Sequence, residues 1–244
     1  MASSTLKDKW DRRIWYPWLQ SLGRLSRDYS PRRIDVQWPE RPSRIDFLSA
    51  LVRSQKFESY LEIGCRDDEC FSQVPAAHKV GVDPCSGGTV RATSDEFFAG
   101  NSGTFDLIFI DGLHLADQVV RDIQNCLRFL NPGGVIVLHD CLPRDSVAQF
   151  RRRCSQIWNG DVWKALVEVR TWPRVDAAMC LIDQGLGIVT ARPNTDPIPL
   201  PAKSFLELKY DQLVDDHRRL LRTLDYDEGL QFAVRAPDSA PASR

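Results

Sequence analysis

The chain has 244 residues, enough for one sizeable core, and its 43% hydrophobic and 27% charged residues are ordinary for a globular protein. Its formal net charge of -1 gives no reason to expect a nucleic-acid or membrane partner, and no apolar stretch is long enough for a membrane span. The N-terminus lacks the apolar core of a signal peptide, and the 7 cysteines are odd in number and form no C-x-x-C pair. We therefore expect reduced thiols and a cytoplasmic location.

Residues 1–57 are predicted to form an N-terminal extension of helical and irregular segments. Up to residue 42 the chain is rich in Arg, Trp and Pro and shows no strand pattern. A helix is predicted over residues 44–55, with Ser43 as its N-cap. An earlier amphipathic helix is indicated by the roughly helical spacing of Trp10, Ile14, Trp15 and Trp18.

The core, residues 58–195, alternates strand and helix patterns. A helical stripe runs from Leu115 to Leu130, and Asn131-Pro132-Gly133-Gly134 is expected to stop that helix. Parallel βαβ units followed by a hairpin predict an α/β, Rossmann-like doubly wound sheet, mostly parallel, with a C-terminal antiparallel hairpin and helices on both faces. Strands are predicted over 60–64, 79–83, 89–94, 106–111 and 135–140, and the hairpin over 177–183 and 188–191.

The end of the chain is predicted to add helix and then disorder. Residues 196–235 form a C-terminal helical extension, in which 205–224 has apolar residues at helical spacing and serves as a docking or dimerisation helix. A homodimer is therefore left open. Residues 236–244 are rich in Pro, Ala and Ser and are expected to be disordered.

Polar residues follow the predicted strands at the edge where doubly wound sheets bind ligands. Asp83 ends the second strand, where a carboxylate accepts hydrogen bonds from ribose hydroxyls. The loop after the first strand has one glycine, whereas a dinucleotide fold uses three to bring its backbone against a pyrophosphate. S-adenosylmethionine has no phosphate, so the loop favours this cofactor over NAD. The candidate cofactor residues at these strand ends are Glu62, Gly64, Cys65, Asp83, Ser94 and Asp95.

The segments YLEIGCRDDECF, KVGVDP, TSDEFF and FDLIFIDGLHLADQVVRDIQNCLRFLNPGGVIVLHDCLP resemble class I S-adenosylmethionine-dependent methyltransferases related to bacterial sugar and natural-product O-methyltransferases. The resemblance covers about residues 58–195. It implies cofactor-facing acids at Glu62, Asp83 and Asp111, metal ligands at Asp111 and Asp140, and a histidine base at His114. Many metal-dependent relatives carry a second acid or an amide beside the last aspartate. This chain departs from them, with His139 before Asp140 and Cys141 after it.

The chemistry of methyl transfer explains why such residues would be needed. The acceptor oxygen, the methyl group and the sulfur must be aligned, and the hydroxyl must lose its proton. Asp111 and Asp140 end strands that we expect to be neighbours, so their carboxylates would face one crevice and suit Mg²⁺ or another divalent cation. His114 lies at its mouth as the candidate base, with His139, Asp111 and a metal-bound hydroxide as competitors. A metal-free site, in which Asp140 caps a helix and His114 is only a helix-start residue, remains the alternative.

These patterns predict an S-adenosylmethionine-dependent O-methyltransferase for a small hydroxylated acceptor, with a sugar or glycoside as the first candidate. The run Arg151-Arg152-Arg153 either attracts an anionic acceptor or forms a solvated helix face. Two other functions remain open. One is a nicotinamide-dependent oxidoreductase, which the glycine loop and the hairpin disfavour. The other is a catalytically silent protein that binds the cofactor and serves a complex.

Overall fold

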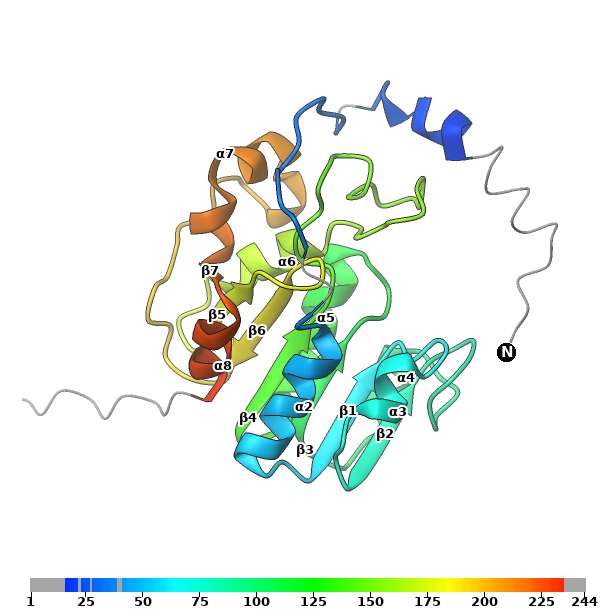
Figure 1. The fold of residues 1–244 in the computed structure, drawn as a ribbon, viewed down its shortest axis with the longest axis vertical. Coiled ribbons are helices and arrows are strands. Elements are labelled where there is room, and N and C mark those ends of the chain that lie inside the picture. The colour runs from blue at the N-terminus through cyan, green and yellow to red at the C-terminus, as the bar shows by residue number, and fades with distance from the viewer. Residues whose placement is uncertain (1–15, 22, 27, 39–40, 235–244) are drawn as a thin grey trace, which may run out of the picture.

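The structure, a computed structural model, describes residues 16–21, 23–26, 28–38 and 41–234 (Figure 1). Residues 16–21 are helical, in line with part of the amphipathic helix predicted near the N-terminus. Trp10, Ile14 and Trp15 of that prediction, and the tail 236–244, lie outside the described residues. Within the described ranges, no helix is long and apolar enough to cross a membrane.

Seven strands form one sheet in the order β2-β1-β3-β4-β6-β5-β7 (Figure 1). Strands β2, β1, β3 and β4 are parallel, β6 runs antiparallel to both β4 and β5, and β7 is parallel to β5. The predicted mostly parallel sheet with a C-terminal antiparallel hairpin is thus confirmed. The strands are β1 (Ser59–Ile63), β2 (His78–Val82), β3 (Phe105–Ile110), β4 (Leu130–Leu138), β5 (Asp176–Cys180), β6 (Leu186–Thr190) and β7 (Thr223–Leu224).

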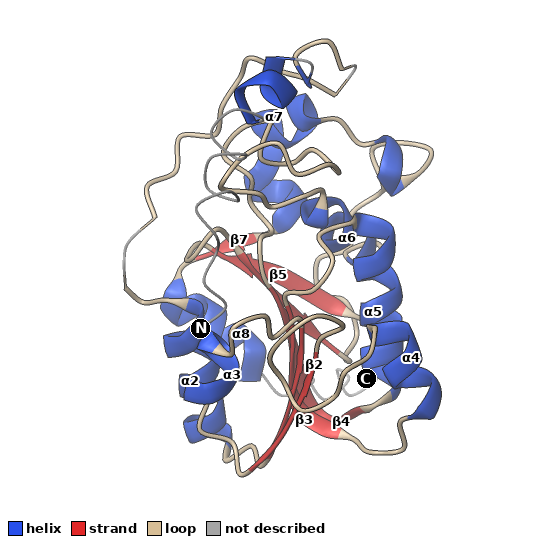
Figure 2. Ribbon diagram, turned by 90° about the vertical axis from the view of Figure 1, so that its right-hand side faces the viewer, coloured by secondary structure: helices blue, strands red, loops and turns tan. Residues whose placement is uncertain are grey.

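Helices cover both faces of the sheet (Figure 2). One buried cluster joins one sheet face to α4, α5, α6 and α7, and the other joins the opposite face to α2, α3 and α8. The helix before residue 58 and the strand and helix after residue 195 therefore pack on the same sheet as the core. The helices are α2 (Arg44–Gln55), α3 (Glu69–Gln73), α4 (Ser94–Gly100), α5 (Ala116–Arg128), α6 (Val162–Val169), η1 (Phe205–Glu207), α7 (Tyr210–Leu221) and α8 (Tyr226–Val234).

Strand side chains alternate between the two clusters. Leu107 and Phe109 of β3 belong to one cluster, whereas Ile108 and Ile110 belong to the other. All four are at most 3% exposed. Central parallel strands covered on both faces carry continuous apolar runs, which is why their sequences were recognisable.

The predicted third strand is wrong. Residues 89–94 form only an isolated bridge between Val82 and Val90, and the chain then enters α4. Thr93 caps that helix, because its side chain accepts a hydrogen bond from the Glu96 amide while the Glu96 carboxylate accepts one from the Thr93 amide. Ser94 and Asp95, predicted to end a strand, instead form the first turn of this helix.

Three further boundaries differ from the prediction. The helix that was expected to reach Leu130 ends at Arg128, and residues 131–134 lie inside β4, whose pairing with β3 shifts register there. The expected helix over 205–224 is divided into η1, α7 and β7. The run 151–153 lies in a loop and forms no helix face, and Arg151 is paired with Asp117 and Asp161.

Candidate functional site

Neighbouring strands of the sheet end level with one another and bring the predicted site residues together. Ile63 pairs with Ile110, and Ile110 pairs with Leu138, so the residues that follow β1, β3 and β4 meet at one edge. At this edge Gly64 has a φ of +91°, and a Cβ there would lie 2.3 Å from the carbonyl oxygen of Asp111. The glycine therefore lets the ends of β1 and β3 approach closely.

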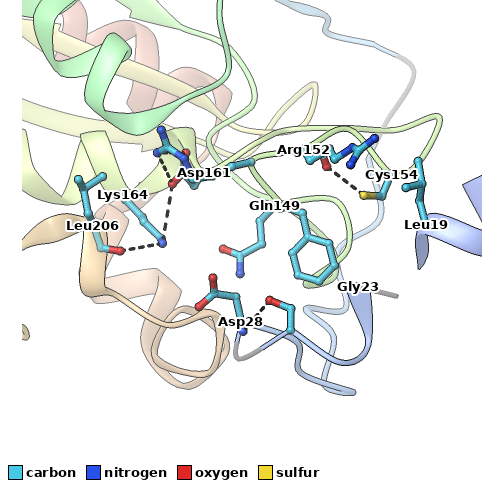
Figure 3. Close-up of a pocket in the computed structure, with 12 residues that line it drawn as sticks. Leu19, Gly23, Asp28, Gln149, Arg152, Cys154, Asp161, Lys164 and Leu206 are labelled. Carbon is cyan, nitrogen blue, oxygen red and sulfur yellow. Dashed lines mark hydrogen bonds and ion pairs between the residues drawn. The ribbon is translucent and has the colours of Figure 1, made fainter. Parts of the chain in front are cut away.

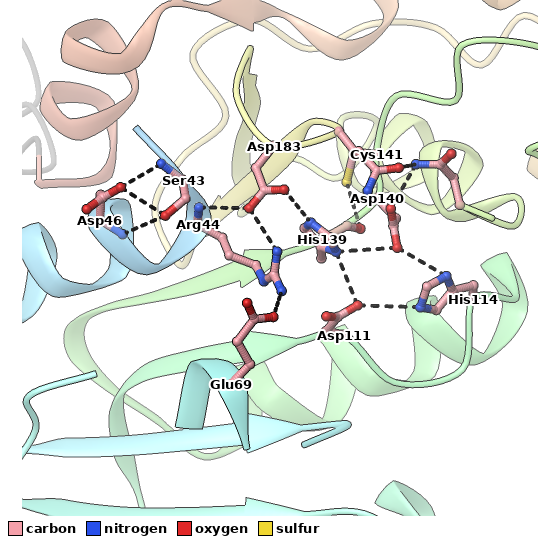
Figure 4. Close-up of polar contacts among 12 residues, drawn as sticks. Ser43, Arg44, Asp46, Glu69, Asp111, His114, His139, Asp140, Cys141 and Asp183 are labelled. Carbon is pink, nitrogen blue, oxygen red and sulfur yellow. Dashed lines mark hydrogen bonds and ion pairs between the residues drawn. The ribbon is translucent and has the colours of Figure 1, made fainter. Parts of the chain in front are cut away.

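A cluster of acids and imidazoles lies beyond β3 and β4 (Figure 4). His139 Nδ1 is 3.3 Å from Asp111 Oδ1 and 3.3 Å from Asp140 Oδ2. His114 contacts the same two oxygens. Its Nε2 is 3.4 Å from Asp111 Oδ1, and its Nδ1 is 3.2 Å from Asp140 Oδ2. The structure thus brings Asp111, His114 and Asp140 together, as their positions in the sequence predicted.

The loop after β4 fixes both His114 and Asp140. The His114 ring stacks on Trp158 with a centroid separation of 4.9 Å, and its Nδ1 is 3.0 Å from the Trp158 carbonyl oxygen. Asn159 donates a 2.8 Å hydrogen bond to Asp140 Oδ1, which leaves Oδ2 facing the cluster. Gly160 packs so closely that a Cβ would lie 1.8 Å from the His114 carbonyl oxygen.

A third carboxylate reaches the cluster from the β5–β6 turn. Asp183 Oδ1 lies 3.5 Å from His139 Nε2, on the side of the ring away from Asp111. Asp183 Oδ2 accepts hydrogen bonds from the Arg44 amide at 2.9 Å and from Arg44 Nη1 at 3.0 Å. Arg44 also pairs with Glu69 at 2.8 Å, so α2 and α3 are tied to the same cluster (Figure 4).

The charges in this cluster shift one another's pKa values. Burial alone would lower the pKa of both imidazoles, but the Asp111 and Asp140 carboxylates outweigh it and raise the pKa of His114 and, much further, that of His139. Burial would raise the pKa of Asp111 and Asp183, but the charge and hydrogen bonds of the histidines, and of Arg44 for Asp183, hold both well below their usual range. Protonated rings and ionised carboxylates are therefore mutually stabilised.

The donor atoms of Asp111, His139 and Asp140 also fit a cation, since all lie within 4.8 Å of one another. Adjacent ligands of an octahedral ion with bonds of about 2.1 Å lie about 3 Å apart. The two 3.3 Å separations around His139 Nδ1 are close to that spacing. The cluster is thus compatible with a divalent ion and also with the metal-free alternative, in which imidazolium rings supply the positive charge.

Glu62 and Cys65 lie deeper than expected for cofactor contacts. Glu62 is 2% exposed and accepts a 2.5 Å hydrogen bond from the Tyr60 hydroxyl, and burial raises its pKa to about 7. The Cys65 side chain is also buried, its thiol points to the Glu62 carbonyl oxygen, and burial raises its pKa. Only the backbone of Cys65 is therefore well placed for a ligand.

Asp83 organises the loop after β2. Its Oδ1 accepts hydrogen bonds from the amides of Cys85 and Ser86, and its Oδ2 accepts one from the Arg66 amide at 3.0 Å. A carboxylate oxygen accepts about two hydrogen bonds, so Oδ2 retains capacity for one ligand hydroxyl. Ser94 and Asp95 lie near α5, within 3.2 Å and 3.3 Å of Gln118 Nε2.

A cavity of about 490 Å³ opens beside the loop that holds His114 (Figure 3). Asp161 connects the two regions, because it lines the cavity and also accepts a 2.8 Å hydrogen bond from the Ala116 amide at the start of α5. The lining is partly apolar, with Leu19 and Phe150, and partly charged or polar, with Asp28, Gln149, Arg152, Asp161 and Lys164. The lining thus combines a largely apolar surface with a few charged and polar groups.

Sequence patterns did not indicate several residues of the site. Trp158, Asn159 and Gly160 lie in an irregular loop, and Asp183 and Arg44 reach the cluster only through tertiary packing. His139 was noted only as a competing base, although its position beside Asp140 placed it in the same crevice.

Comparisons with known proteins agree with this architecture. Residues 47–141 match a family model described as a methyltransferase domain, and no curated protein matches. Cofactor-bound Rv0187 from MTB is 19% identical, with 78% of this chain and 94% of that chain covered and a TM-score of 0.50. The O-methyltransferase from Bacillus cereus in complex with SAH is 15% identical, with 77% and 98% covered and a TM-score of 0.46.

At these identities the structural likeness to Rv0187 indicates the fold, and the match of residues 47–141 indicates the kind of domain. That match runs from α2 to Cys141 and therefore includes Asp111, His114 and Asp140. The same segment carries the motifs whose resemblance to methyltransferases is described above. Residues 47–141 of the chain thus match a methyltransferase domain, and its fold is like that of cofactor-bound Rv0187.

Proposed function

We propose that this chain transfers the methyl group of S-adenosylmethionine to a hydroxyl oxygen of a small acceptor. As the new oxygen–carbon bond forms, the carbon–sulfur bond breaks, the hydroxyl proton passes to a base, and S-adenosylhomocysteine leaves. A hydroxyl is a weak nucleophile and needs a base or a cation at the oxygen. The observation that carries the proposal is the cluster of Asp111, His114, His139 and Asp140, which offers candidate bases and side chains that could hold a cation.

The cofactor is proposed to lie across the ends of β1, β2 and β3. The free capacity of Asp83 Oδ2 suits a ribose hydroxyl, and the start of α4, with Ser94 and Asp95, would lie beside the adenine. Gly64 and the backbone of Cys65 would border the methionine part, with Glu62 beneath them. Asp111 would then lie at the junction between cofactor and acceptor.

His114 is proposed as the base, and Asp111 and Asp140 as ligands of a divalent cation. A bound cation would lower the pKa of the acceptor hydroxyl. The His114 ring is held by Trp158 and reaches both carboxylates, so it is anchored where a proton would be released. A cation held by Asp111 and Asp140 would offset the charge of these carboxylates and favour the neutral ring, which is the form that accepts a proton.

The cavity beside Asp161 supports a polar acceptor, with a sugar or glycoside as the first candidate. Gln149 and Lys164 line it and are both buried, at 4% and 6% exposure, and Lys164 Nζ donates a hydrogen bond to the Leu206 carbonyl oxygen (Figure 3). Phe150 offers an aromatic edge beside them. Small-molecule sites in general combine apolar and aromatic side chains with a few polar groups that orient the ligand.

Turnover of labelled S-adenosylmethionine on a panel of hydroxylated compounds, glycosides included, tests the proposal. We expect a methyl ether as the product, loss of turnover in excess chelator, and recovery with a divalent ion. Full activity in chelator would be consistent with O-methylation and would contradict a catalytic role for the cation. Cofactor binding without methylation of any acceptor would instead favour the catalytically silent alternative, and calorimetry with NAD addresses the oxidoreductase.

A further inference from the structure

His139 has only carboxylates around its two ring nitrogens. Nδ1 faces Asp111 and Asp140 at 3.3 Å each, and Nε2 faces Asp183 at 3.5 Å. The side chain is 6% exposed, so water does not replace these neighbours. A neutral imidazole donates from one nitrogen and presents a lone pair at the other. That lone pair would face acceptors alone unless a cation lies beside it.

The position of Asp183 sets which nitrogen of the neutral His139 ring carries the lone pair. Arg44 holds Asp183 Oδ2 through its amide and its guanidinium, and Arg44 is itself paired with Glu69. Asp183 Oδ1 is thereby held 3.5 Å from Nε2, and the neutral ring carries its proton on Nε2 because a lone pair there would face the carboxylate. The remaining nitrogen, Nδ1, is then the one that points between Asp111 and Asp140. A carboxylate behind a ligating imidazole commonly fixes the tautomer in this way.

We propose that the cation site takes a first-row transition ion such as Mn²⁺ or Zn²⁺ in preference to Mg²⁺, with His139 Nδ1 as a ligand and Asp183 as its positioning residue. The inference rests on the cation site of the proposed function and narrows it. Oxygen-only sites suit Mg²⁺, whereas an imidazole nitrogen favours transition ions. The chain has a histidine at the position before Asp140, so its site combines one nitrogen with two carboxylates.

Direct binding of the ions to the purified chain tests this inference without an acceptor. Calorimetry with Mn²⁺, Zn²⁺ and Mg²⁺ should show at least about tenfold tighter binding of the transition ions. In the Mn²⁺ form, electron spin echo spectra should show coupling to a directly bound nitrogen. His139→Asp makes the ligand set all oxygen, so it should lose that coupling and shift the preference toward Mg²⁺.

Asp183→Asn separates the positioning role from simple loss of charge. The amide keeps the shape but can present its NH₂ to Nε2, so transition-ion affinity should fall about 10–100-fold while Mg²⁺ affinity changes little. Asp215→Asn is the matched control, because it removes a carboxylate paired with an exposed arginine, Arg32, and should leave both affinities unchanged.

The possible outcomes are distinguishable. If the wild-type chain binds none of the three ions, both the cation of the proposed function and this inference are overturned. If it binds Mg²⁺ as tightly as Mn²⁺ and Zn²⁺, or if Asp183→Asn leaves the ratio of affinities unchanged, the inference fails while the cation site stands. A Mn²⁺ form without nitrogen coupling would contradict the role of His139.

Discussion

Substitution of Gly160 by alanine should disturb the site through a clash with the His114 backbone. A control substitution at Gly133 separates this clash from the backbone penalty. Gly160 has a φ of +60°, and its added Cβ would lie 1.8 Å from the His114 carbonyl oxygen. Gly133 has a φ of +80° and nothing within 4 Å of the corresponding position. Both alanines carry the backbone penalty of the left-handed region, about 1–2 kcal/mol. Only Gly160→Ala adds a clash between two backbone segments.

Relief of that clash requires a movement of about 1 Å or more, because Cβ contacts under 3.0 Å essentially never occur in proteins. Overpacking of this kind costs about 1–3 kcal/mol beyond the backbone penalty. The same movement would displace the Trp158 ring from His114 and Asn159 from Asp140. A shift of about 1 Å at reacting groups can lower turnover about 100-fold.

Urea unfolding and the imidazole NMR signals of His114 measure the two effects. Gly133→Ala should lower the unfolding free energy by about 1–2 kcal/mol and leave the His114 signals in place. Gly160→Ala should lower it further and shift those signals. Equal destabilisation of the two variants, with unchanged His114 signals in both, would refute the packing argument.

Three other substitutions test the roles of single residues. Asp83→Ala should weaken S-adenosylhomocysteine binding about tenfold or more, and unchanged affinity in calorimetry would contradict its place on the ribose. Burial raises the Glu62 pKa to about 7 from an ordinary 4.5, so the unfolding free energy of the cofactor-free chain should fall by up to about 3 kcal/mol as pH rises from 4.5 through 7. Glu62→Gln should remove this fall, and an identical pH dependence of unfolding in the variant would show that Glu62 is not its source. His114→Ala should lower kcat about 10²–10⁴-fold with cofactor binding nearly intact. Wild-type kcat should rise with pH as the His114 ring loses its proton, and the same profile in the variant would assign the proton to another group.

The sequence predicted what depends on local pattern and missed what depends on packing. Buried strands such as β3 could be predicted from their apolar runs. The polar residues that follow them, including Asp111, could therefore be assigned to the strand ends. Residues 89–94 were predicted as a strand, but the Thr93–Glu96 capping box starts a helix there instead. Asp183 could not be placed because its turn reaches the site only through the order of strands β4, β6 and β5.

Charge balance in the cluster leads to the last prediction. The cluster contains three carboxylates, those of Asp111, Asp140 and Asp183. Their positive partners are the imidazoles of His114 and His139, together with Arg44, which pairs with Asp183. Apart from the exposed Glu69, two protonated rings together with Arg44 balance the three acids, and a divalent ion together with Arg44 and two neutral rings balances them equally well. We therefore expect the chain to fold without the cation.

Removal of the cation should consequently separate activity from stability. A chelator should abolish turnover, while the chain loses only the stabilisation given by mass action, about 2.7 kcal/mol at a hundredfold excess of ion over its Kd. Circular dichroism and thermal unfolding with and without chelator measure this. The circular dichroism spectrum of the folded chain should be the same with and without chelator. The Tm should be modestly lower in chelator. A chain that unfolds outright in chelator would mean that the paired imidazolium rings do not replace the ion, and that the cluster is a structural metal site.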